Sequence, residues 1–185
     1  MLDLVYEEVR EKMSKTVEKF KNELKKVRTG RASLALLDGI TVDYYGTPTP
    51  LNQLASLSVP ESRLIVIQPW DAGSIKDVEK AILQANIGLT PSNDGKVIRL
   101  TVPPLTEERR KEIAKRVHQM AEDYKVAVRN VRRDANETLK QMKKDGDISE
   151  DDAFSGKDKI QEITDSYIKQ IDEVFKAKEK EILEI

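Results

Sequence analysis

The chain has 185 residues, of which 35% are charged and 5% aromatic, and its formal net charge is −1. This composition favours thin, elongated helices with solvated outer faces over one thick globular core. The neutral balance argues against a protein that coats nucleic acid through bulk positive charge, and the lack of cysteine excludes disulfides and thiolate metal sites.

No apolar run approaches the ~20 residues that a membrane-spanning helix needs, and the acidic, amphipathic start of the chain is unlike a secretory signal. We therefore expect a soluble, cytoplasmic protein with no membrane partner.

The first predicted element is a helix over residues 2 to about 28, roughly 40 Å long. Apolar residues recur there at steps of three and four, which is the pattern of one buried helix face. The residues of this seam are Val5, Val9, Met13, Thr16, Phe20, Leu24 and Val27. Gly30, within "RTGRAS", is the expected breaker after the helix.

Residues 31–104 have a different texture and predict a small α/β domain. A β-rich run with a Gly/Pro turn, "GITVDYYGTPTPL", comes first, and "RLIVIQ" and "KVIRLTV" predict two further short strands. Between them, "SIKDVEKAILQANIG" predicts an amphipathic helix that begins with a capping box of Ser74 and Asp77 and ends at Gly88.

Two long helices follow. Pro103 and Pro104 cannot continue a central strand, and Thr106 is a suitable N-cap for a helix of roughly 55 Å. This second helix has a seam from Ile113 to Met142 and ends at Gly146. The third helix begins at a capping box of Ser149 and Asp152, and its seam comprises Ile160, Ile163, Tyr167, Ile171, Val174, Lys178 and Ile182.

Three seamed helices interrupted by one α/β segment predict an α+β fold with a discontinuous domain. Residues 1–30 and 105–185 would form an elongated three-helix bundle, and residues 31–104 an inserted small α/β domain. A single compact α/β domain is the alternative, but it would leave the long helices exposed. The two short connections between the domains, "TGR" and "VPPL", resemble a hinge.

Charge is partly segregated around the second helix, because Glu107 and Glu122 interrupt its basic side. With Val128 at zero and about 100° per residue, one set of cations falls between roughly 40° and 140°. This basic strip comprises Lys111, Lys115, Lys125, Arg129, Arg132, Arg133, Lys140 and Lys143, together with His118 and Asn136. An acidic strip falls between roughly 180° and 240° and comprises Glu112, Asp123, Asp134 and Glu137.

Pattern alone leaves three interpretations of the basic strip open. It is a solvated face with local pairs such as Arg133 with Glu137, a rigid row of guanidinium groups that docks on RNA phosphates, or a protein–protein surface. Catalysis has no support, because phosphate-binding loops are absent and no carboxylate or nucleophile is placed beside His118. We expect no enzyme, no cofactor and no metal site.

The chain resembles the bacterial ribosome recycling factor family over its full length. The segments that carry the resemblance are "VRTGRAS", "LLDGITVDYYGTPTPLNQLA", "VPPLTEERRKE", "VAVRNVRRDAN" and "DISEDD". The resemblance implies a three-helix bundle and a smaller α/β domain joined by a two-stranded hinge into an L shape.

The resemblance also implies a function. Such a factor binds post-termination ribosomes through its bundle, on large-subunit rRNA, and elongation factor G with GTP then drives subunit separation. The factor itself hydrolyses nothing and acts as a monomer. The RNA-facing residues would be Arg129 and Arg132, with Arg133 as a weaker inclusion.

The resemblance also singles out residues near the hinge. Arg28 and Arg31 match the family's "RTGR" segment, where a structural role in the hinge is the alternative to RNA binding. The hinge candidates are Gly30, Pro103 and Pro104. Two rival classes remain, a coiled-coil protein that pairs with other chains and an RNA-modifying enzyme.

Overall fold

The computed structural model describes residues 1–184, which fall into two compact units. The helical unit comprises Met1–Val27 and Glu108–Glu184, and the sheet unit comprises Arg28–Glu107. The helical unit is therefore built from two stretches of sequence that the sheet unit separates. Over the described chain, no helix is long and apolar enough to cross a membrane.

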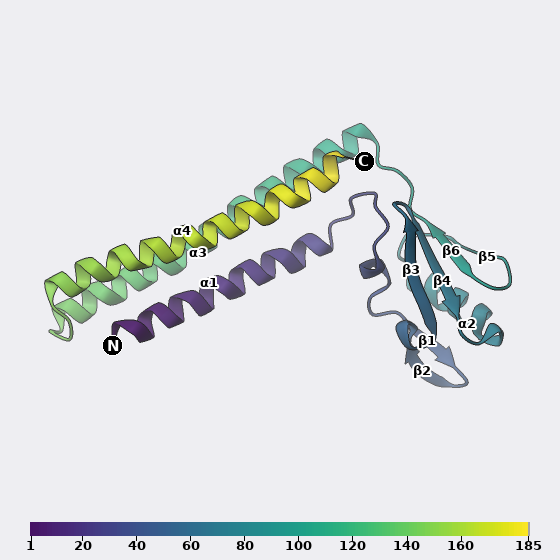
Figure 1. Ribbon diagram of the computed structural model, residues 1–185, viewed down its shortest axis with the longest axis horizontal. Helices are drawn as coiled ribbons and strands as arrows, with labels where there is room; N and C mark the ends of the chain where they lie inside the picture. The colour runs from purple at the N-terminus through teal and green to yellow at the C-terminus, as the bar shows by residue number, and fades with distance from the viewer. Residues whose placement is uncertain (185) are drawn as a thin grey trace. The chain divides into compact units, whose positions relative to one another are not determined.

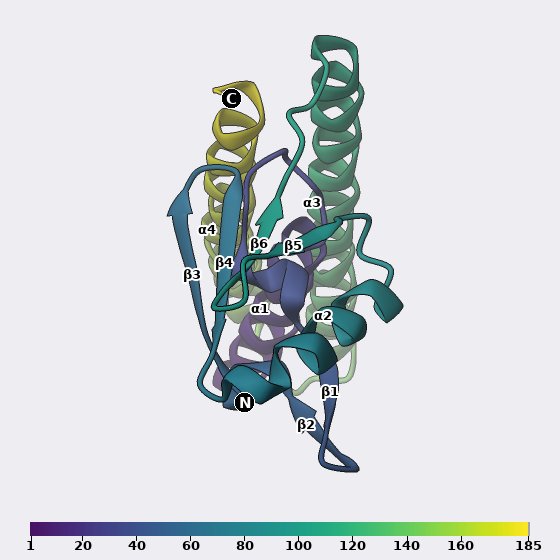
Figure 2. The same ribbon diagram turned by 90° about the vertical axis from the view of Figure 1, so that its right-hand side faces the viewer.

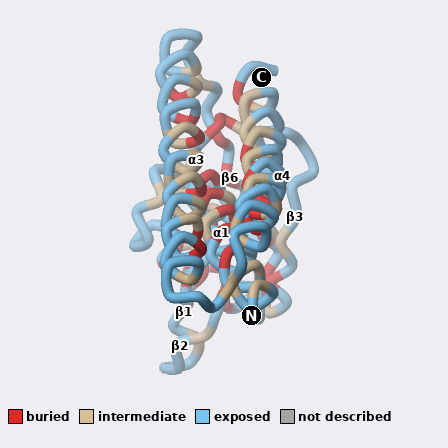
Figure 3. The backbone as a smooth tube through the Cα atoms, turned by 90° about the vertical axis from the view of Figure 1, so that its left-hand side faces the viewer, coloured by how far each residue is buried: buried red, intermediate tan, exposed pale blue. Residues whose placement is uncertain are grey.

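Three long helices lie alongside one another in the helical unit (Figure 1). They are α1 (Leu2–Lys25), α3 (Glu107–Lys144) and α4 (Glu150–Leu183). The expected seams face inward, as the buried positions in Figure 3 show. The core includes Val9, Met13, Phe20, Leu24, Val117, Val128, Leu139, Ile160, Ile171 and Ile182. Phe20 of α1 packs on Tyr124 of α3, with ring centroids 5.1 Å apart.

The helix ends differ in how well local sequence predicts them. The capping box of α4 is confirmed, because Ser149 Oγ accepts a hydrogen bond from the Asp152 N–H at 3.0 Å and the Ser149 N–H donates to Asp152 Oδ2 at 3.3 Å. The end of α1 at residue 28 is wrong. The Val27 N–H donates to the Leu24 carbonyl at 3.1 Å, so the last turn tightens and the helix ends at Lys25.

The sheet unit holds a hairpin and a four-stranded antiparallel sheet. The hairpin pairs β1 (Thr41–Tyr44) with β2 (Thr47–Pro50). The sheet has the order β3-β4-β6-β5, formed by Ala55–Glu61, Leu64–Pro69, Ile98–Thr101 and Pro91–Asn93. Helix α2 (Ile75–Gln84) lies across the strands of this unit (Figure 2). Short 3₁₀ turns occupy Leu34–Leu37, Leu51–Gln53 and Ala72–Ser74.

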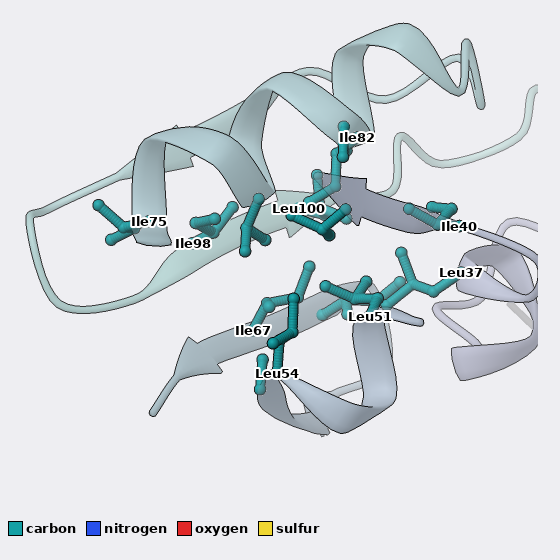
Figure 4. Close-up of a cluster of buried hydrophobic side chains, with 14 residues drawn as sticks. Leu37, Ile40, Leu51, Leu54, Ile67, Ile75, Ile82, Ile98 and Leu100 are labelled. Atoms are coloured by element: carbon teal, nitrogen blue, oxygen red, sulfur yellow. The ribbon is translucent and has the colours of Figure 1, made fainter. Parts of the chain in front are cut away.

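The sheet unit has its own hydrophobic core, which helix, strands and turns share (Figure 4). Its members include Leu37, Val42, Leu51, Ile65, Ile67, Val78, Ile82, Ile98 and Leu100. Burial of such side chains contributes about 1.5–3 kcal/mol each. The sheet unit can therefore be ordered by contacts within residues 28–107.

The predicted capping box at the start of α2 is wrong. Ser74 adopts helical backbone angles, and its hydroxyl donates to the Asp71 carbonyl at 2.7 Å instead of capping α2. Asp71 is the cap, since its Oδ1 accepts from the Gly73 N–H at 2.9 Å. The helical path thus begins at Ala72 as a 3₁₀ turn that runs directly into α2.

Candidate functional site

The basic strip follows α3 along one flank of its buried seam. Val117, Val128 and Leu139 are buried and hold the helix in the bundle. Lys111, Lys115, His118, Arg133, Lys140 and Lys143 are exposed, whereas Lys125, Arg129, Arg132 and Asn136 are partly buried. The middle of the strip therefore lies closer to a neighbouring helix than its two ends do.

That neighbour is α4, and it removes one cation from the strip. Lys125 Nζ lies 2.5 Å from Asp172 Oδ1 of α4 and 3.3 Å from Glu122 Oε1, and its side chain is 15% exposed. The hydrogen bond to Asp172 raises the pKa of Lys125 against the opposing effect of burial. Lys125 is thus a charged residue of the strip that is paired within the bundle.

Arg132 also contacts α4, but through a neutral group. Its Nη1 donates to Gln161 Oε1 at 2.7 Å, and Gln161 Nε2 in turn donates to Asp165 Oδ1 at 2.8 Å. The Arg132 Nε is buried and has no hydrogen-bond partner within residues 1–184. No carboxylate neutralises this guanidinium in the described chain, so it keeps its full charge while Gln161 restricts its rotamers.

The other two predicted arginines are less constrained. Arg129 is partly buried and Arg133 is exposed, and neither forms an ion pair within the described residues. The Arg133–Glu137 pair, the example given for the solvated-face interpretation, is not formed. Arg129, Arg132 and Arg133 therefore present uncompensated positive charge along one stretch of a rigid helix.

One residue of the acidic strip, Asp134, borders a different helix. Asp134 lines a small cavity of about 50 Å³ between α1 and α3, together with Glu8 and Lys12 of α1. Lys12 Nζ lies 2.7 Å from Glu8 Oε1. Asp134 of the acidic strip thus lies where α3 meets α1, whereas Arg132 lies where α3 meets α4. The nearly neutral chain thus carries a local row of arginines on the α4 side of α3.

Arg28 belongs to the sheet unit. Its Nη2 donates to the Ile87 carbonyl, and its guanidinium lies over Gly88. Gly88 has a φ of +78°, which favours glycine, and a Cβ there would lie 2.8 Å from Arg28 Nη1 and displace the guanidinium. This contact favours the structural role for Arg28 over RNA binding. Arg31 is partly buried and forms no hydrogen bond or ion pair in the part of the chain described.

The two connections to the sheet unit touch each other. Gly30 is buried with a φ of +77°, and a Cβ there would lie 3.0 Å from Leu105 Cγ of the other connection. Pro103 and Pro104 are exposed and lie outside any helix or strand. Because proline donates no backbone hydrogen bond, Pro103 and Pro104 cannot extend the pairing of β6, and the chain stays irregular until α3 begins.

Two residues near the strip have no signal in the sequence. Gln161 and Asp172 lie on α4, and each meets its partner on α3 only in the folded bundle. His118 packs edge-on against Phe175 of α4, with ring centroids 5.6 Å apart. Within residues 1–184, no group of three or more possible ligands is arranged to hold a metal ion.

A family model and a curated relative both match most or all of this chain and carry the same description. The family model described as ribosome recycling factor matches residues 20–183. The ribosome-recycling factor of Desulfosudis oleivorans is 84% identical over 185 residues, which is 100% of both chains.

Two solved structures are also similar to this chain. A solution structure of the ribosome recycling factor is 44% identical with a TM-score of 0.79, covering 100% of this chain and 98% of the other. The second structure describes models for the T. thermophilus factor and E. coli elongation factor G bound to the E. coli post-termination complex. It is 44% identical, with a TM-score of 0.66 and 99% coverage of each chain.

Proposed function

Since this chain belongs to the ribosome recycling factor family and its function is ribosome recycling, we propose how its two units divide that work. The helical unit binds the post-termination ribosome through the basic strip, on large-subunit rRNA. Elongation factor G with GTP then acts on the bound protein, and the ribosomal subunits separate. The protein works in the cytoplasm as a monomer and catalyses no reaction itself.

The observation that supports the RNA assignment is the row of three arginines without carboxylate partners on the α3–α4 side of the bundle. Guanidinium groups suit phosphates because their planar fork donates paired hydrogen bonds and is weakly hydrated. A helix of the bundle fixes their spacing, so the row fits a particular RNA shape better than an arbitrary polyanion.

Movement between the units is the second part of the proposal. Gly30, Pro103 and Pro104 form the two connections, which are short and contribute no helix or strand of their own. Such connections allow the sheet unit to be displaced while the helical unit keeps its RNA contacts. A covalent crosslink between the units is expected to leave ribosome binding intact and to block subunit separation.

The direct test is a subunit-splitting assay on post-termination ribosomes. The wild-type protein is expected to split them only when elongation factor G and GTP are both present. The double variant Arg129→Ala/Arg132→Ala is expected to lose most of this activity, whereas Arg116→Ala, an exposed arginine on the acidic side of α3, retains it. Equal splitting by both variants would remove the basic strip from the mechanism.

A further inference from the structure

A groove lies between residues 133–143 of α3 and 150–157 of α4; Figure 1 shows these ends of the two helices side by side. Its volume is about 560 Å³, within the range of sites that hold small organic ligands. The residues that line it are Arg133, Asn136, Glu137, Leu139, Lys140, Lys143, Glu150, Ala153, Phe154 and Lys157. Arg133, Lys140 and Lys143 belong to the basic strip, so the groove continues that surface towards the end of the bundle.

The groove carries more positive than negative charge. Four cations line it against two carboxylates. Lys143 Nζ lies 3.4 Å from Glu150 Oε1, whereas Arg133, Lys140 and Lys157 form no ion pair in residues 1–184. An anion in the groove would therefore meet three cations without ion pairs, from two helices, and one carboxylate, Glu137, that also forms none in the described chain.

Phe154 adds a feature that a phosphate site does not need. It lies in the first turns of α4, and 71% of its surface is exposed although it is a large apolar side chain. Buried phenylalanines contribute to stability, but this ring contributes little to the core. Its face is available for stacking, and aromatic faces hold unstacked nucleobases at about 1–3 kcal/mol per base.

Asn136 adds a polar group on the groove wall. Its Oδ1 is buried and has no hydrogen-bond partner in the described chain. A buried acceptor without a partner is unfavourable, and a change of the Asn136 rotamer that exposes this oxygen to the groove would let a bound donor satisfy it. The groove thus combines cations, an aromatic ring and an unpaired amide oxygen.

We propose that this groove binds one unpaired nucleotide of ribosomal RNA. The base stacks on Phe154, its phosphate meets Arg133, Lys140 and Lys157, and its edge contacts Asn136. Proteins recognise RNA at splayed-out bases in this way, because the groove edges of an A-form duplex are poorly readable. The proposal rests on the ribosome-binding function above and adds a nucleobase contact to its phosphate contacts.

The test measures binding to isolated large ribosomal subunits with a set of variants at position 154. Phe154→Ala and Phe154→Leu are expected to bind about 10-fold more weakly, because neither can stack. Phe154→Trp is expected to bind as well as the wild type. The matched control is Leu4→Ala on α1, since Leu4 is 70% exposed and does not line the groove. Circular dichroism melting curves establish that each variant is folded.

Two further readouts identify the occupant. The dependence of affinity on salt is expected to stay unchanged in Phe154→Ala, because no charge is removed, and to weaken in Arg133→Ala. Ultraviolet crosslinking of the wild-type complex is expected to leave a nucleotide adduct on the peptide that contains Phe154. A crosslink from that peptide to a ribosomal protein would overturn the proposal.

The proposal also fails if Phe154→Leu binds like the wild type, since a merely apolar contact would then suffice. It fails equally if Phe154→Ala retains full affinity. In either case the phosphate contacts are tested separately by the arginine variants, so loss of the nucleotide site leaves the ribosome-binding function standing.

Discussion

Replacement of Arg132 by alanine gives the sharpest measure of the phosphate contacts. Arg132 has a full positive charge with no carboxylate partner in the described chain, and its one observed hydrogen bond goes to the neutral Gln161. If its guanidinium contacts one phosphate, Arg132→Ala lowers the slope of log affinity against log salt by about 0.7–0.9. Over a fourfold rise in salt, the wild type then loses about threefold more affinity than the variant.

The assay is equilibrium binding to large ribosomal subunits at several salt concentrations. Arg132→Lys keeps the charge and is expected to keep the slope at reduced affinity, because the planar fork is lost. Gln161→Ala releases the side chain without removing charge, so affinity falls while the slope is unchanged. Arg116→Ala controls for loss of any exposed arginine on the same helix.

This reasoning is refuted if Arg132→Ala has the same slope of log affinity against log salt as the wild type. Arg132 would then be a structural residue that ties α3 to α4, and any loss of affinity would follow from a disturbed bundle. A lowered slope in Gln161→Ala would be equally damaging, because that variant changes no charge.

Three predictions concern the frame that holds these surfaces. Gly30→Ala is expected to lower the unfolding free energy of the sheet unit by about 1–2 kcal/mol because of its positive φ, and by a further amount because the new Cβ meets Leu105. Gly39 has a φ of +79° but open space around it, so Gly39→Ala is expected to show only the cost of the positive φ when both variants are unfolded in denaturant. Ser149→Ala is expected to lower the unfolding free energy by about 1 kcal/mol, and an unchanged melting curve would show that the Ser149 cap does not stabilise the helix. Hydrogen bonds from two backbone N–H groups lower the pKa of Asp94 below its ordinary 3.8, so its stabilisation is present above that pH and is lost in stronger acid. The stability gap between wild type and Asp94→Asn should therefore close on acidification, and a gap that persists in acid would contradict this cause.

The long helices were predictable because their information is local and repeated. Each seam recurs at steps of three and four over many turns, and the buried residues of α1, α3 and α4 follow it. The missed strands lack such a signal. β3 is an edge strand with mostly exposed side chains and Pro60 near its end, and β5 has three residues. Their strand state comes from pairing with β4 and β6, which the local sequence does not encode.

Capping shows the same limit on a smaller scale. Ser74 and Ser149 both precede an aspartate by three residues, yet only Ser149 forms the capping box. The difference lies upstream, because Asp71 already begins a 3₁₀ turn that places Ser74 in a helical conformation. The shared spacing therefore predicts a helix start in both places, but not which residue is the cap.

For the candidate site, the sequence predicts which face of the helix carries the cations but not which helix lies next to that face. The angular position of the basic strip follows from the helical period, which places Arg129, Arg132 and Arg133 on one flank. The period does not say that α4 borders this flank. For that reason the pairing of Lys125 with Asp172 and the restraint of Arg132 by Gln161 appear only in the structure.

The interrupted order of the helical unit has a consequence for how the chain is made. α1 leaves the ribosomal exit tunnel first, but α3 and α4, whose side chains complete its core, are encoded after residue 106. Because translation adds about 5–20 residues per second, the apolar face of α1 stays exposed for many seconds before α3 and α4 are made. The sheet unit meanwhile has all of its core residues and can fold first. A translation factor of this design is thus complete only when its last segment emerges, so premature truncation would remove core residues from the helical unit but none from the inserted sheet unit.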